Sequence, residues 1–283
     1  MEDIARLAVV VDSFAYPDGT IAVRDIGLDV RAGEFIGILG SNGSGKTTLL
    51  KIMDGLLKDF KGSVALDGTD LRKLSAKEIY RKIGLIFQNP DDQLFAPTVA
   101  EDVAFGPLNM GILERDVKAR VHKALVDVDM ADYLNKSIHS LSFGQKKRAC
   151  IAGLLSMGHE ILLLDEPTAG LDPMGEYKMM SLLTRLNREN RVTIVMATHS
   201  VDLVPLFLDR LCILSKGRMA RAGTPEEVFT APDDMEHAKL RLPHVAEVIY
   251  RLKHEDKVPF GKIPLTIGEA RREILRIIEE RHA

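Results

Sequence analysis

The chain has 283 residues, of which 46% are hydrophobic and 28% charged, so it can bury a large core, and this composition excludes a disordered protein. Its 38 basic and 41 acidic side chains give a formal charge of -3, which excludes nucleic-acid wrapping or membrane binding by bulk charge. Two distant cysteines, Cys150 and Cys212, exclude a disulfide framework and favour a reducing compartment. The acidic start does not resemble a signal peptide, and no apolar run approaches the roughly 18 to 20 residues that cross a bilayer. We therefore expect a cytoplasmic protein, which could still dock on a membrane protein.

Short apolar runs alternate with helical patterns, which favours βαβ units and a mainly parallel sheet. At the N-terminal end, residues 7–11 and 21–23 predict antiparallel strands joined through the turn signal at 16–19. The fold class that we expect is α/β, with a parallel sheet and a small antiparallel β-subdomain. Buried strands are predicted at 34–39, 83–87, 161–164 and 192–197.

The remaining segments predict helices. Residues 107–135 carry helical spacing without a strand signal, which indicates a helical insertion. Thr224 to Glu227 form a capping-box pattern with proline at the first helical position, and this helix is expected to stop near Pro232. A short tail follows, and a second capping box at 266–269 opens an amphipathic helix that packs on its own domain or offers a surface to a partner or a second copy. Its apolar side comprises Ile267, Ala270, Ile274, Ile277 and Ile278.

A phosphate-binding loop follows the strand predicted at 34–39. The pattern is G-x-x-x-x-G-K-[ST], and the helix that it opens is expected to run to about Leu57. Glycines let successive N–H groups point inward, the helix N-terminus adds about half a positive charge, and lysine adds a full one. The threonine hydroxyl that ends the pattern is a candidate Mg²⁺ ligand. The residues are Gly40, Ser41, Asn42, Gly43, Ser44, Gly45, Lys46 and Thr47, with Thr48 next in the helix.

Polar side chains end three other predicted strands. Asp165 and Glu166 follow the strand at 161–164, where Asp165 could hold Mg²⁺ and Glu166 could orient or deprotonate a water that attacks the γ phosphate. His199 follows the strand at 192–197 and could reach the same phosphate. Gln88 ends a further strand, and its amide could contact Mg²⁺ or the water. A parallel sheet is expected to bring these strand ends beside the phosphate loop.

Four motifs in order make the chain resemble the nucleotide-binding subunits of ABC transporters. They are the phosphate loop, the signature Leu141-Ser142-Phe143-Gly144-Gln145, Leu164-Asp165-Glu166-Pro167 and Ala169-Gly170-Leu171-Asp172. The signature discriminates this family from other phosphate-loop ATPases, although the usual LSGGQ has glycine where this chain has Phe143. Ser142, the Gly144 backbone and the following helix N-terminus would form a second anion site.

This resemblance implies an ATPase domain at about 5–230, with a helical insertion at about 90–155, and a C-terminal extension at 231–283. It implies ATP and Mg²⁺ as cofactors and a second protomer, in a homodimer or heterodimer, whose ATP meets the signature. Further roles follow by position: Tyr16 stacks on adenine, Gln88 belongs to the Q-loop, Asp172 to the D-loop between protomers, and His199 is the switch histidine.

A narrower resemblance comes from residues 84–95 and 98–107, which look like the ATPase of energy-coupling factor importers, particularly the cobalt/nickel type. The tail around 240–243 and 264–267 is also similar. The implied partners are a transmembrane coupling protein and a small substrate-capturing membrane protein, with no nucleic acid, and the implied location is the cytoplasmic face of the cell membrane. Substrate choice would reside in another subunit, so a vitamin importer stays open.

The sequence disfavours three other functions. A GTPase normally needs N-K-x-D, and the nearest string, at 135–138, lacks the aspartate. A soluble, non-transport ABC ATPase of the DNA-repair or chromosome-organising kind would carry a long coiled coil between Lys46 and Leu141, where no sustained heptads occur. A regulatory module that binds ATP without turnover is disfavoured by the presence of Glu166 and His199.

Overall fold

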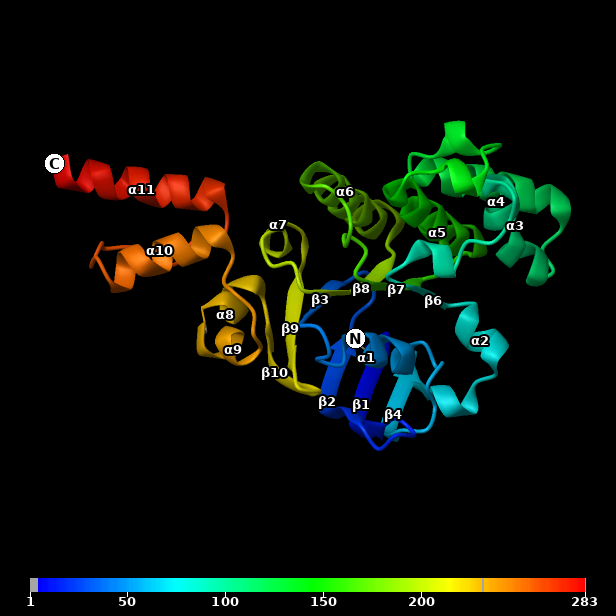
Figure 1. Ribbon diagram of the computed structural model, residues 1–283, viewed down its shortest axis with the longest axis horizontal. Helices are drawn as coiled ribbons and strands as arrows, with labels where there is room; N and C mark the ends of the chain where they lie inside the picture. The colour runs from blue at the N-terminus through cyan, green and yellow to red at the C-terminus, as the bar shows by residue number, and fades with distance from the viewer. Residues whose placement is uncertain (1–4, 231, 283) are drawn as a thin grey trace.

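The computed structural model describes residues 5–230 and 232–282. Positions 231 and 283, which belong to the expected C-terminal extension, lie outside the described residues. Two sheets organise the N-terminal part of the chain (Figure 1). The smaller sheet has the order β2-β1-β4-β5, and its two first strands pair antiparallel, as predicted. Its members are β1 (Leu7–Ala15), β2 (Ile21–Val30), β4 (Lys61–Leu66) and β5 (Thr69–Asp70).

The larger sheet has the order β10-β9-β3-β8-β7-β6. Neighbours from β9 to β6 pair in parallel, and β10 joins the β9 edge in the antiparallel direction. The predicted α/β class with an added antiparallel β-subdomain is therefore confirmed. Its strands are β3 (Phe35–Leu39), β6 (Ile83–Ile86), β7 (Ile161–Asp165), β8 (Thr193–Thr198), β9 (Arg210–Ser215) and β10 (Arg218–Gly223).

The central strands β3, β7 and β8 are buried along their whole length, because both faces of this sheet are covered. Alternate side chains enter two separate cores. Phe35 and Leu39 face a core shared with the helical insertion, whereas Ile36 and Ile38 face a core shared with α1 (Lys46–Met53) and the smaller sheet. The parallel sheet is thus the middle layer, and burial of both its faces explains why the predicted strands read as unbroken apolar runs.

The helix α1 ends earlier than the sequence pattern suggested. We expected it to run to about Leu57, but it stops at Met53, with Asp54 as the C-cap. Gly55 adopts a left-handed conformation at φ +76°, and the backbone N–H of Leu56 turns back to bond the carbonyl of Lys51. This glycine-terminated cap ends the helix before the apolar residues that extended the pattern.

The helical insertion contains α3 (Val99–Asn109), α4 (Glu114–Asp127) and α5 (Phe143–Met157), which pack together at one end of the large sheet (Figure 1). The helix α3 begins upstream of the predicted start at 107, because Thr98 and Glu101 form a capping box. A short helix, α2 (Ala76–Tyr80), precedes β6, and α6 (Pro173–Asn190) and α7 (Val204–Phe207) complete the layer around β8.

After β10 the described residues form helices joined by loops, without a further strand. The predicted capping box at Thr224 is present and opens α8 (Pro225–Phe229), which ends before Pro232. The segment that we expected to be a short tail contains two further helices, α9 (Pro232–His237) and α10 (His244–His254). The terminal helix α11 (Ile267–His282) lies beside α10, away from the sheets (Figure 1).

The pair α10 and α11 has its own small core of Ile249, Phe260, Ala270 and Ile277. Ile267 in contrast is 78% exposed, so only part of the predicted apolar side packs within the chain. The capping box at 266–269 is half formed, because the Glu269 carboxylate accepts a hydrogen bond from the Leu265 N–H instead of returning to Thr266. Among the described helices, none is both long and apolar enough to span a membrane.

The carboxyl group at the end of α1 predicts a pH effect on stability. Burial raises the pKa of Asp54 from 3.8 to about 7, so the folded chain binds this proton more tightly than the unfolded chain. That stabilisation is fully present below about pH 4 and is lost as the pH rises through about 7. We expect Asp54→Asn, which mimics the protonated form, to melt at a higher temperature than the unmodified chain at pH 8, with the gap closing toward pH 4.

Thermal denaturation followed by circular dichroism from pH 4 to pH 8 checks this expectation. Asp59→Asn, which makes the same change at an exposed position five residues away, is the matched control. A difference between Asp54→Asn and the unmodified chain that stays constant across the range would contradict it.

Candidate functional site

The loop between β3 and α1 has the geometry of a phosphate cradle. A Cβ at Gly40 would lie 2.4 Å from the Ser44 hydroxyl oxygen, and Gly45 has φ +104° with its Cβ position 2.6 Å from a backbone oxygen, so glycine is required at both. The Nζ of Lys46 donates hydrogen bonds to the carbonyls of Gly40 (2.7 Å) and Ser41 (3.3 Å). The loop therefore curls around its own lysine at the N-terminus of a helix, as the motif predicted.

This loop lines a cavity of about 410 Å³. The other walls come from the turn between β1 and β2, from the end of β6 and from the end of β7, so segments that are far apart in sequence meet here. The lining residues are Tyr16, Thr20, Ile21, Ala22, Asn42, Gly43, Ser44, Gly45, Lys46, Thr47, Thr48, Gln88, Asp165 and Glu166.

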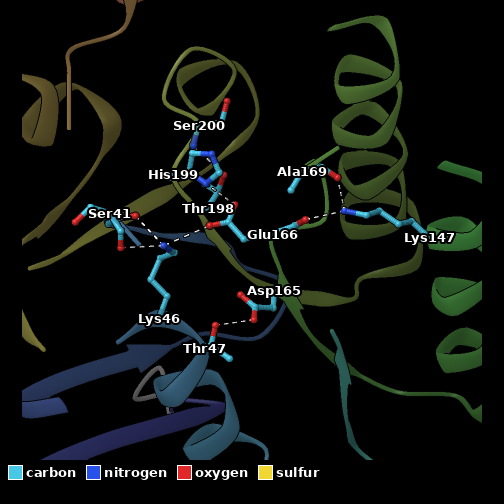
Figure 2. Close-up of polar contacts among 11 residues, drawn as sticks. Ser41, Lys46, Thr47, Lys147, Asp165, Glu166, Ala169, Thr198, His199 and Ser200 are labelled. Carbon is cyan, nitrogen blue, oxygen red and sulfur yellow. Dashed lines mark hydrogen bonds and ion pairs between the residues drawn. The ribbon is translucent and has the colours of Figure 1, made fainter. Parts of the chain in front are cut away.

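The centre of the site is the Glu166 carboxylate, which lies between two basic groups (Figure 2). Its Oε1 is 3.3 Å from the Nζ of Lys46, and its Oε2 is 3.0 Å from the Nδ1 of His199. The side chains of Lys46 and Glu166 are each 6% exposed, whereas that of His199 is 53% exposed. A buried carboxylate held in this way can accept a proton from, or orient, a water that enters from the cavity.

Asp165 and Thr47 lie next to this centre. The Thr47 hydroxyl donates to Oδ2 of Asp165 at 2.7 Å, while the buried Oδ1 of Asp165 has no hydrogen-bond partner among the described residues. Burial raises the pKa of Asp165, against the hydrogen bond from Thr47, which lowers it. A hydroxyl oxygen beside a carboxylate oxygen without a hydrogen-bond partner matches the hard oxygen donors that Mg²⁺ takes, so these residues fit the metal that the sequence predicted.

The strand order explains how these residues meet. The large sheet places β8 between β3 and β7, so the strand that carries Asp165 is not the direct neighbour of the phosphate loop. The carboxyl ends of β3, β8, β7 and β6 still lie at one edge of the parallel sheet, which collects the phosphate loop, His199, Asp165 and Gln88.

Tyr16 reaches the cavity from the β1–β2 turn. Its hydroxyl is 3.0 Å from the hydroxyl oxygen of Thr48, and its ring packs edge-on against Phe14. Tyr16 is 36% exposed, so part of it is open to solvent beside the phosphate loop. Gln88 lines the same cavity and is exposed.

The predicted signature residues lie elsewhere. Among the described residues that line the cavity, none comes from 141–145. Ser142 is the N-cap of α5, where it forms a reciprocal capping box with Gln145, and Leu141 is buried in the core. Asp172 likewise caps α6, accepting a hydrogen bond from the Gly175 N–H at 2.7 Å. These residues lie at two further helix N-termini and do not line the first site.

The sequence reasoning missed Lys147. This lysine is 2% exposed, and its Nζ donates to the backbone carbonyls of Glu166 and Ala169, each at 2.8 Å (Figure 2). Burial lowers its pKa to about 8, against the attraction of Glu166, which raises it. The spacing of 147 to Cys150, Ile151 and Leu154, which are buried on the same helix, was the signal that this lysine faces inward.

Comparison with known proteins agrees with this geometry. The family described as ABC transporter matches residues 23–169. An energy-coupling factor transporter ATP-binding protein, EcfA, from Methanocaldococcus jannaschii is 47% identical over 270 residues, which cover 95% of this chain and 96% of the relative.

Two solved structures have the same fold. The structure of cbiO1 from Clostridium perfringens, part of the ABC transporter complex cbiONQ, matches with a TM-score of 0.76 and 38% identity, covering 87% of this chain and 99% of that one. The dimeric post-hydrolysis structure of the ATP-binding cassette MJ0796, bound to ADP and Pi, matches with a TM-score of 0.67 and 28% identity, covering 78% of this chain and 99% of that one.

The cradle geometry predicts the effect of removing its lysine. Lys46→Ala takes away the one full positive charge that the phosphate loop itself contributes, so we expect ATP to bind at least about tenfold more weakly, which is about 1.4 kcal/mol. Equilibrium binding of a fluorescent ATP analogue measures this change. Lys61→Ala, which removes an exposed lysine from β4, is the control and should bind the analogue like the unmodified chain. Unchanged affinity in Lys46→Ala would count against the phosphate-loop assignment.

Proposed function

The chain belongs to the ABC transporter family of ATP-binding proteins, and from this premise we propose that it powers a membrane importer of the energy-coupling factor type. It is an ATPase that uses ATP with Mg²⁺. The buried Glu166 carboxylate between Lys46 and His199 supports the ATP-hydrolysing role, and the similarity to EcfA and cbiO1 supports the importer type.

In the proposed mechanism the phosphate loop holds the β and γ phosphates through its inward N–H groups and Lys46. Mg²⁺ would be held by Thr47, Asp165 and Gln88, and when bound it neutralises charge on the phosphates. Glu166 orients the attacking water and takes its proton, and His199 contacts Glu166 and the γ phosphate. Tyr16 stacks on the adenine, beside the loop from Gly40 to Thr48.

We assign residues 141–145 and Asp172 to the contact with a second protomer. In a head-to-tail dimer, the α5 N-terminus with Ser142 and Gly144 would bind the γ phosphate of the partner's ATP, because a helix N-terminus favours an anion. The capping box between Ser142 and Gln145 supports this role, since it fixes the first turn that presents the N–H groups. ATP would close the dimer, and hydrolysis with product release would reopen it.

The cargo that we propose is cobalt or nickel ions. The resemblance of residues 84–95 and 98–107 to the cobalt/nickel type supports it, as does the similarity to cbiO1. Residues 5–230 would form the ATPase domain and 231–283 the extension. The chain would work at the cytoplasmic face of the membrane with a transmembrane coupling protein and a small capture protein. The name EcfA does not specify a cargo, so a vitamin importer is the second candidate.

The catalytic role of Glu166 has a direct test. Glu166→Gln keeps the size of the side chain but removes its basicity, so we expect ATP binding and ATP-dependent dimers to persist while turnover falls at least about 100-fold. Release of phosphate and gel filtration with ATP measure the two properties. Glu189→Gln, which alters an exposed carboxylate of α6, is the matched control. Near-normal hydrolysis by Glu166→Gln would overturn the assignment.

The transport role is tested in native membranes. The Glu166→Gln variant is purified from detergent-solubilised membranes of the host with ATP present, and bound proteins are identified by mass spectrometry, with Lys46→Ala as the comparison. We expect a transmembrane coupling protein together with a small capture protein. If ATP-dependent dimers form but carry no membrane protein, the transport proposal fails and a non-transport ABC ATPase is favoured.

The cargo is decided by uptake into vesicles that contain the isolated complex. ATP-dependent accumulation of radioactive cobalt or nickel is the expected result. Accumulation of a vitamin with neither metal transported would contradict the cobalt/nickel proposal and leave the importer assignment in place.

A further inference from the structure

A single lysine links the signature helix to the turn that carries Glu166. The ammonium group of Lys147, in the second turn of α5, donates to the Glu166 and Ala169 carbonyls. Both acceptors lie in the segment 166–172, which we call the D-turn and which connects β7 to α6. Figure 2 shows Lys147 reaching across to this turn from the opposite side to Lys46 and His199.

The D-turn has a conformation that needs external support. Glu166 has φ +51°, which is uncommon for a residue with a side chain, and Gly170 has φ +77°. Inside the turn the N–H groups of Ala169 and Leu171 bond the carbonyls of Glu166 and Thr168. Neither of these local bonds uses the Ala169 carbonyl, which accepts a hydrogen bond from Lys147. Because Lys147 also binds the Glu166 carbonyl, it connects residues 166 and 169 of the turn.

Phe143 covers this link from the solvent side. The Nζ of Lys147 lies 5.1 Å from the centre of the Phe143 ring, within the range of a cation–π contact. A Cβ added at Gly170 would lie 3.0 Å from the same ring, so the ring leaves little room for a side chain there. The residue that departs from the usual signature therefore lies beside both the lysine and the D-turn.

Burying this ammonium group is costly unless its hydrogen bonds are made. Transfer of a charge out of water is offset here by two carbonyls, an aromatic face and the nearby Glu166 carboxylate. An apolar side chain would fill the space without that cost but would leave the Ala169 carbonyl without this donor. The hydrogen bonds of the Lys147 ammonium therefore fix the conformation of the D-turn.

We propose that Lys147, covered by Phe143, is a positioning residue for ATP hydrolysis, which holds the backbone of Glu166 and the D-turn in register with the signature helix of the same chain. The inference rests on the proposed function, in which Glu166 activates water and the signature meets the partner's ATP. Each protomer would then carry a rigid connection between the helix that binds one nucleotide and the carboxylate that acts on the other.

The test compares Lys147→Met and Lys147→Gln with the unmodified chain in steady-state ATP hydrolysis. Methionine fills the space without a donor, and we expect kcat to fall about 10- to 100-fold, because a small displacement of a catalytic group has effects of this size. The KM for ATP should stay within about threefold, since Lys147 is not part of the phosphate loop. Glutamine retains a donor but is shorter than lysine, so its kcat should lie between the two.

Lys146→Met is the matched control, because the neighbouring lysine of the same helix pairs with Asp91 at the surface and should leave kcat unchanged. Phe143→Ala removes the cover and should lower kcat less than Lys147→Met. A kcat equal to that of the unmodified chain in Lys147→Met, or in Lys147→Leu if the methionine variant fails to fold, would overturn the proposal. So would a loss in Lys147→Met that lies wholly in KM.

A second readout separates this inference from the proposed function. The double variant Glu166→Gln, Lys147→Gln should form ATP-dependent dimers like Glu166→Gln alone, because the lysine is assigned to hydrolysis and not to nucleotide binding. Dimers that form only when Lys147 is present would overturn the positioning role and assign the lysine to dimer closure. An unmodified chain that binds ATP but neither dimerises nor hydrolyses it would contradict the proposed function instead.

Discussion

Glu166 is held by groups from three different segments, two at its carboxylate and one at its backbone carbonyl. Lys46 approaches it from the start of α1, His199 from the end of β8, and Lys147 holds its carbonyl from α5. None of these residues is a sequence neighbour of another. They meet because β3, β8 and β7 run in parallel and end at one edge, and because both faces of that sheet are closed by apolar cores.

The same constraint explains why much of the site was predictable. A glycine-rich loop with a lysine, a pair of carboxylates and a histidine each follow an apolar run, and a parallel sheet gathers such positions at its carboxyl edge. The sequence therefore identified the phosphate loop, Asp165, Glu166 and His199 as neighbours. It did not reveal that β8 lies between β3 and β7, since strand order depends on the crossovers and leaves no mark in the motifs.

Other features required knowledge of packing. Lys147 lies in the basic run 146–148, which reads as a solvated helix face; its spacing to Cys150, Ile151 and Leu154 places it on the buried side, but only the structure shows which carbonyls it binds. The early end of α1 depends on Gly55, whose left-handed conformation outweighs the apolar pattern beyond it. The helix α10 has a regular apolar spacing at 245, 248, 249 and 252, but it begins without a side-chain cap, so no start signal distinguishes it from a tail in the sequence.

The small core of the C-terminal helices has a dynamic consequence. Four buried residues hold α11 against α10, whereas Ala246 of α10 belongs to the far larger cluster on one face of the parallel sheet. Local opening costs least where few apolar contacts are broken, so α11 can detach and reform while the parallel sheet stays intact. Amide hydrogens of α11 will therefore exchange with solvent well before those of β3, β7 and β8.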